Sequence, residues 1–154
     1  MKTISLLIVL LVLCLASVGM AGDKSFKATL GGSDVVPPAK PMAKGEAAFQ
    51  LGKDGTELSY KVTVFDIENV TAAHIHQGAK GKNGPPVALI DVKGKKEGKF
   101  SGTLAEGTIT AKELMSSLKG KTVKDLVKEI EAGNAYVNVH TKAFPDGELR
   151  GQLK

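Results

Sequence analysis

A two-residue alternation of apolar and polar side chains constrains the fold of this chain more than any other feature. In the stretch ELSYKVTV, at the start of the run 57–67, apolar side chains stand at even positions and polar ones at odd positions. Successive side chains of a β-strand point to opposite faces of a sheet, so this period predicts a strand with one buried face. Seven further runs have strand composition: 26–30, 46–51, 72–76, 86–92, 99–104, 134–141 and 148–153.

The segments between these runs have the composition of turns. KDGT at 53–56, KNGPP at 82–86, KGKKEG at 93–98 and FPDGE at 144–148 each contain the Gly, Pro, Asn or Asp that a chain reversal needs. Many short strands separated by such turns are typical of all-β domains. The sequence therefore predicts an antiparallel β-sandwich or barrel.

One insert before the last two strands has a helical pattern instead. TAKELMSSLKG begins with Thr110 followed by Glu113 three residues later, and TVKDLVKEIEAGN repeats the arrangement with Thr122 and Asp125 before it stops at Gly133. This spacing is a capping box, a helix N-terminal signal. We expect one or two short helices that cover one end or edge of the sheet.

Residues 1–21 have the features of a secretory signal. Lys2 precedes an apolar run at 4–16, and Gly19 and Ala21 stand at the −3 and −1 positions of a signal-peptidase site. The apolar run is shorter than the roughly 20 residues that cross a bilayer, which argues against a transmembrane anchor. We expect cleavage after Ala21 and secretion to an extracellular or periplasmic space.

The only cysteine, Cys14, lies in this leader. A lipid anchor on Cys14 is the weaker alternative, because Leu13 stands where lipoprotein cleavage requires a small residue. If cleavage follows Ala21, Cys14 is removed with the leader, and the mature chain, residues 22–154, has neither a disulfide nor a membrane anchor. Its length fits a single domain that is stabilised by its own core.

The charge of the chain gives little reason to expect a nucleic-acid partner. Its 21 basic and 16 acidic residues leave a mild positive surplus, which is densest in KGKKEGK at 93–99. That segment has no interleaved aromatic residues on which bases could stack. We interpret it as a solvated turn.

All three histidines of the chain lie on two of the predicted strands. His74 and His76 share one face of the strand 72–76, and His140 shares a face with Asn138 on the strand 134–141. In both strands the opposite face is aliphatic, so the histidines point away from the core. If the strands are neighbours, the three imidazoles converge on one surface spot.

Three neutral imidazoles suit copper(II) or zinc(II), and a set of three protein ligands leaves a position open for water or a small ligand. The alternative is that the histidines are ordinary hydrogen-bonding residues on a polar face. The sequence alone does not decide between these two interpretations.

The last strand brings further polar groups toward this spot. Glu148 and Arg150 stand on its polar face, and the turn at 145–147 folds it back along the strand of His140. A carboxylate there would orient an imidazole, and an arginine would attract an anion toward a metal. The simpler interpretation is a surface ion pair between Glu148 and Arg150 that contributes little to stability.

Common catalytic arrangements are missing from the sequence. The mature chain has no cysteine nucleophile, no serine in a nucleophile-elbow motif and no phosphate-binding loop, since Gly78, Gly81 and Gly84 follow no strand-to-helix unit. We do not expect an enzyme of these classes.

Four stretches closely resemble the CHRD domain, the module named after chordin: LGGSDVVPPAKPMAKGEAAFQL, DGTELSYKVTV, TAAHIHQGAKGKNGPPVALI and NAYVNVHTKAFPDGELRGQL. The resemblance covers about residues 26–153. It implies an exported β-sandwich of immunoglobulin-like style. Growth-factor binding does not carry over, because in chordin that activity is credited mainly to other modules. The family motifs match His74, His76, Tyr136, Asn138, His140, Thr141 and residues 147–152.

The order of the histidines is also similar to the copper ligands of Cu/Zn superoxide dismutase. The bridging histidine, the zinc cluster and the paired cysteines of that enzyme have no counterpart here. Three hypotheses follow. The first is a secreted binding module with a copper site, or less favourably a zinc site, at His74, His76 and His140; its partner is that metal ion or an extracellular or envelope component. The second is a copper-dependent redox enzyme that handles superoxide. The third is a purely structural envelope or matrix domain.

Overall fold

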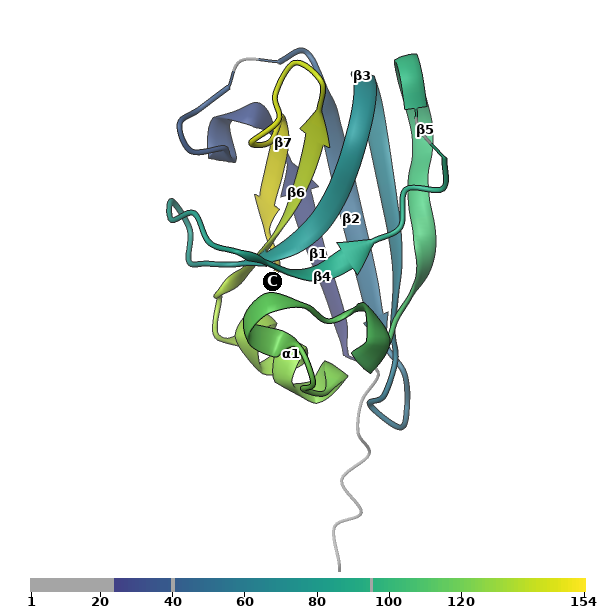
Figure 1. Ribbon diagram of the computed structural model, residues 1–154, viewed down its shortest axis with the longest axis vertical. Helices are drawn as coiled ribbons and strands as arrows, with labels where there is room; N and C mark the ends of the chain where they lie inside the picture. The colour runs from purple at the N-terminus through teal and green to yellow at the C-terminus, as the bar shows by residue number, and fades with distance from the viewer. Residues whose placement is uncertain (1–23, 40, 95) are drawn as a thin grey trace, which may run out of the picture.

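The computed structural model describes residues 24–39, 41–94 and 96–154, so the predicted leader with Cys14 lies outside the described residues. The chain is mostly antiparallel β-sheet (Figure 1). Its strands are β1 Ser25–Leu30, β2 Lys44–Leu51, β3 Leu58–Gln77, β4 Pro86–Ile90, β5 Lys96–Ile109, β6 Ala135–Thr141 and β7 Leu149–Gln152. One α-helix, α1 Val123–Glu131, accompanies three short 3₁₀ turns, Gly32–Asp34, Ala111–Glu113 and Ser116–Leu118. No helix in the described part is long and apolar enough to cross a membrane.

The strand β3 organises the molecule. The runs 57–67 and 72–76 are predicted as separate strands, but the structure joins them in one strand of 20 residues. Asp66 and Asn69 both have φ of 53°, and the pairing register shifts in this region, so the strand bends in its middle. The first half pairs with β2 and β5, and the second half pairs with β4 and β6. The bend therefore carries one strand through two layers of sheet.

The sheet closes on itself through β1 and the C-terminal strand. The backbone N–H of Lys27 donates to the carbonyl of Lys154 at 2.8 Å, and that of Gly31 donates to the carbonyl of Arg150 at 3.0 Å. Bonds in the opposite direction, from Arg150 and Lys154, complete both pairs. The strand order β1, β2, β3, β6, β7 thus returns to β1. The predicted all-β sandwich or barrel is confirmed.

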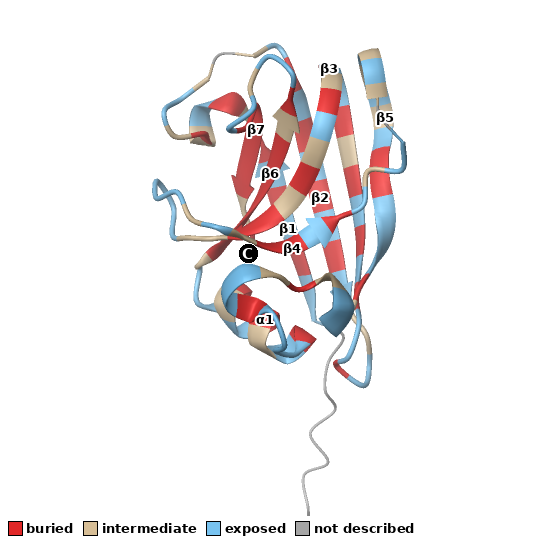
Figure 2. Cartoon of the chain, viewed as in Figure 1, coloured by how far each residue is buried: buried red, intermediate tan, exposed pale blue. Residues whose placement is uncertain are grey.

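The core lies between these layers and follows the predicted alternation. Figure 2 shows buried and exposed residues in turn along β1 and β2. The aliphatic faces that contain Ala73 and Ile75 on β3, and Val137 and Val139 on β6, are completely buried. The strands β6 and β7 differ from β1 and β2, because nearly all their residues are buried on both faces. The histidine face of β6 is therefore covered.

The helical insert forms one α-helix, within the one or two short helices expected. The Thr122 capping box is present, and α1 buries Val123, Leu126, Val127 and Ile130 at the end of the barrel (Figure 1). The capping box of Thr110 and Glu113 is also present, but it starts a single 3₁₀ turn. The segment after this turn forms no α-helix, because Leu114 is extended and forms a bridge with Ala88, while the N–H of Met115 donates to the carbonyl of Val87 at 2.9 Å. Pairing with the free edge of β4 prevails over the local helix signal.

Candidate metal centre

The pairing of β3 with β6 brings the three histidines together. In the register, His74 lies opposite Asn138, His76 opposite Tyr136, and Ala72 opposite His140. Because alternate side chains share a face, all three imidazoles stand on the same side of the sheet. The ring centroids are 5.8 Å apart for His74 and His76, 5.5 Å for His74 and His140, and 5.6 Å for His76 and His140. The structure thus forms the triangle that the strand pattern predicts.

The nitrogens of this triangle are close enough to hold a metal ion. One ring nitrogen from each histidine lies within 4.8 Å of the other two. Nitrogens bound at about 2.0–2.1 Å to one ion would be about 3.3–3.6 Å apart. The rings would have to rotate toward one another to bring any wider pair to this separation. Nδ1 of His74 and Nε2 of His76 are buried and have no hydrogen-bond partner, which fits ligand atoms.

Two backbone carbonyls select the tautomers of this set. Nδ1 of His76 lies 2.8 Å from the carbonyl oxygen of Gly84, and Nδ1 of His140 lies 2.8 Å from that of Pro145. A carbonyl oxygen only accepts, so each Nδ1 carries a proton, and in the neutral form of the ring the lone pair is on Nε2. Hydrogen bonds of this kind are typical of metal-binding histidines.

The surroundings keep the rings of His74 and His76 neutral at neutral pH. Burial, followed by the neighbouring rings of His140 and His76, lowers the pKa of His74 to about 4. Burial also lowers the pKa of His76; His140 and Arg150 contribute in the same direction, against the opposing effect of the Gly84 carbonyl. Protons therefore do not compete with a metal for these two rings at neutral pH.

The cluster is more enclosed than the sequence predicts. We expected a solvated polar face, but only 8 % of His76 is exposed, and His74 and His140 are half-buried. The loop 78–85 and the loop 142–148 reach over the rings and supply the two carbonyls described above. The predicted surface site is therefore wrong in its exposure.

Asn138 lies beside His140 in the covered face. Its Nδ2 donates to the carbonyl of Asp146 at 3.1 Å and lies 3.5 Å from Nε2 of His140. Its Oδ1 is buried without a partner. Gly147 has φ of 129°, and a Cβ at this position would collide with the Asn138 amide. A glycine is therefore needed for the loop to pack against Asn138.

Glu148 and Arg150 do not behave as the predicted surface pair. Both are buried, and no ion pair joins them in the part of the chain that the structure describes. Glu148 accepts a bond of 2.7 Å from the Thr141 hydroxyl. The guanidinium of Arg150 lies 3.5 Å from the centroid of the Tyr136 ring. The exposed ion pair is a wrong expectation, because two loops cover this face.

Two groups that orient the imidazoles are not apparent from the sequence. They are the carbonyls of Gly84 and Pro145. The ring of Tyr136, a residue of the family motif, stacks on His76 at 5.2 Å and 21°, and this contact was not predicted either. Backbone carbonyls have no sequence signal of their own. Tyr136 does have one, because it shares the polar face of its strand with His140.

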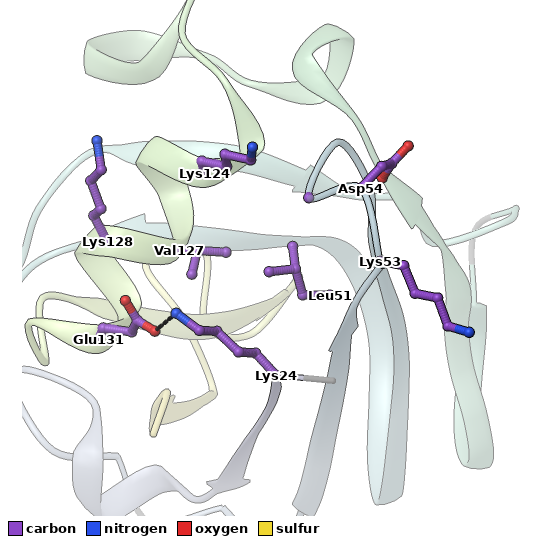
Figure 3. A pocket seen from close by; sticks show the side chains of 10 residues that line it. Lys24, Leu51, Lys53, Asp54, Lys124, Val127, Lys128 and Glu131 are labelled. Atoms are coloured by element: carbon purple, nitrogen blue, oxygen red, sulfur yellow. Dashed lines mark hydrogen bonds and ion pairs between the residues drawn. The ribbon is translucent and has the colours of Figure 1, made fainter. Parts of the chain in front are cut away.

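A separate groove lies between α1 and the turn after β2 (Figure 3). It has a volume of about 360 Å³ and an apolar floor that includes Leu51 and Val127. Lys24 and Glu131 form an ion pair of 2.6 Å at its rim. The groove contains no histidine, so it is not part of the metal centre.

Comparison with known proteins assigns the family. A family model of the CHRD domain matches residues 26–153. Searches of curated proteins and of solved structures found no match. CHRD domains are binding modules of extracellular type. The match spans nearly the whole chain, and the chain belongs to the CHRD domain family.

Proposed function

We propose that this protein is an exported CHRD-domain binding module that holds one copper ion through His74, His76 and His140. The observation that carries the proposal is the pair of buried nitrogens, Nδ1 of His74 and Nε2 of His76, that have no hydrogen-bond partner in a cluster of three imidazoles. A buried polar atom without a partner is costly. A bound cation would give both atoms a partner.

Copper is preferred to zinc because of its intrinsic affinity. Imidazole nitrogens bind both ions, and the affinity of a given site for divalent first-row metals is highest for copper(II). Three protein ligands leave at least one position open for water or a ligand from a partner. Copper bound there would supply one-electron redox chemistry. The protein would supply three imidazoles on one face of the sheet, two of which are oriented by backbone carbonyls.

The open position also supports a second candidate, a copper-dependent enzyme that handles superoxide. Arg150 is not suited to steer an anion to the site, because its guanidinium is buried and donates to the loop 79–83. A superoxide assay of the copper-loaded protein, with metal-loaded His76→Ala as its control, tests this candidate. Activity no greater than that of free copper would exclude it.

The binding experiment is a titration of the mature, tag-free protein with copper(II) and zinc(II). We expect one equivalent of copper to bind, tighter than zinc, and both His76→Ala and His140→Ala to lose this stoichiometric binding. Glu106→Ala removes an exposed carboxylate on β5, outside the cluster, and should leave binding unchanged. Binding that survives both histidine substitutions would favour the purely structural domain.

A further inference from the structure

Arg150 is a buried cation whose hydrogen bonds all go to one loop. It is 2 % exposed, and none of the ion pairs among the described residues involves it. Its guanidinium donates to the carbonyl of Ala79 at 3.1 Å, to the carbonyl of Lys82 at 2.8 Å and to Oδ1 of Asn83 at 3.1 Å. These bonds fix the middle of the loop 78–85 to β7.

The same side chain is one end of a stack of three groups. The guanidinium of Arg150 lies on the Tyr136 ring, whose other neighbour in the stack is the imidazole of His76. The Tyr136 hydroxyl accepts a bond of 3.1 Å from the N–H of Gly84. The carbonyl of Gly84 accepts from Nδ1 of His76. The loop and the stack therefore meet at His76.

We propose that Arg150 is a positioning residue for His76. By holding the loop 79–83 and the Tyr136 ring, it keeps the Gly84 carbonyl against Nδ1 of His76 and so fixes the tautomer that carries its proton on Nδ1. The Nε2 lone pair is then directed toward the other two histidines. This inference rests on the proposed metal site for its purpose, but the tautomer itself is a property of the metal-free protein.

An arginine is suited to this position, whereas a lysine is not. The planar guanidinium stacks on an aromatic ring and donates several bonds in fixed directions. A lysine would retain the charge but would neither stack in the same way nor bridge Ala79, Lys82 and Asn83 together. The ends of the loop have other contacts, such as Gln152 to the carbonyl of Gly78 at 2.9 Å. Arg150→Lys should therefore loosen the middle of the loop while the barrel stays folded.

The test is to measure the histidine tautomers of the metal-free, ¹⁵N-labelled protein by long-range ¹H–¹⁵N correlation spectra at neutral pH. We expect Nδ1–H for both His76 and His140 in the wild type. Arg150→Lys should shift His76 toward the Nε2–H tautomer and leave His140 unchanged, since Pro145 orients that ring. Lys80→Ala, which removes an exposed charge from the same loop, is the matched control and should change neither ring.

Two results would overturn the inference. One is an Nε2–H tautomer of His76 in the wild type, which needs no variant to observe. The other is an unchanged His76 tautomer in folded Arg150→Lys. If that variant does not fold, Tyr136→Phe gives an independent test: loss of the hydroxyl bond to Gly84 should increase the Nε2–H population of His76, and an unchanged population would contradict the inference.

Copper affinity then separates the inference from the proposed function. Loss of a group that orients a ligand typically weakens metal binding about 10-fold to 100-fold, and we expect a loss in this range for Arg150→Lys. A tautomer shift in a protein that binds no copper would support the role of Arg150 and contradict the metal site. If the wild type binds copper, and Arg150→Lys leaves both the His76 tautomer and the copper affinity unchanged, the metal site is supported and the role of Arg150 is contradicted.

Discussion

At the scale of single residues, the protonation of His74 makes stability depend on pH. We expect the metal-free protein to lose stability as pH falls from about 6.5 to about 4. The pKa of His74 is lowered from 6.5 to about 4, chiefly by burial. Between these values the unfolded chain binds the proton and the folded chain does not, so acid favours unfolding. His76, whose pKa is also lowered mainly by burial, acts in the same direction.

Urea unfolding at pH about 7.5 and about 4.5, in the presence of a chelator, measures this effect. His74→Gln replaces the ring with a polar side chain that does not titrate, so the loss of stability on acidification should be smaller. We expect a difference on the order of 1 kcal/mol, because solvent screening reduces the effect at a partly exposed ring. Equal losses in the two proteins would contradict this assignment.

The face of each strand on which the three histidines stand was predictable from alternation, whereas the pairing of the two strands was not. Odd and even positions in residues 72–76 and 134–141 point to different faces of the sheet. The imidazoles therefore stand on the face that does not contain Ala73, Ile75, Val137 and Val139, and the structure agrees. The burial of that face was not predictable. It depends on where two loops fold, and their contacts use the carbonyls of Gly84 and Pro145, which every residue type would offer.

At the scale of the element, the bend of β3 depends on two residues in the left-handed region. Asp66 is exposed and has φ of 53°. A β-branched side chain is strained there, whereas glycine is not. We expect Asp66→Val to lower the free energy of unfolding by about 1–2 kcal/mol, and Asp66→Gly to change it little. Urea unfolding of the two variants checks this, and equal stabilities would contradict it.

The two capping boxes, at Thr110 and at Thr122, lead to different structures. The Thr122 box starts a real helix, because Leu126 and Ile130 have a buried surface to cover. The Thr110 box starts only one turn, because the next residues pair with the edge of β4. Both boxes look alike in the sequence. The difference lies in a partner strand that is more than twenty residues away in the chain.

At the scale of the whole molecule, closure of the barrel brings the site together. The bonds between β1 and the C-terminal segment fix β7 from one side and its pairing with β6 fixes it from the other, and β7 carries Arg150 toward the loop that orients His76. The all-β class was predictable from turns and alternation. The closure between β1 and β7 was not predictable, because it is made by backbone N–H and carbonyl groups, which nearly every residue type offers. The closed barrel supplies a rigid frame for three ligands that come from two strands.

The central claim is that one copper ion binds all three histidines. Electron paramagnetic resonance of the protein with one equivalent of copper(II), including pulsed measurements of imidazole nitrogen couplings, tests it most directly. We expect couplings from three imidazoles in the wild type, and no signal of stoichiometrically bound copper with this set of couplings in His140→Ala. Couplings that remain unchanged in His140→Ala, or a wild-type spectrum without imidazole couplings, would contradict the claim.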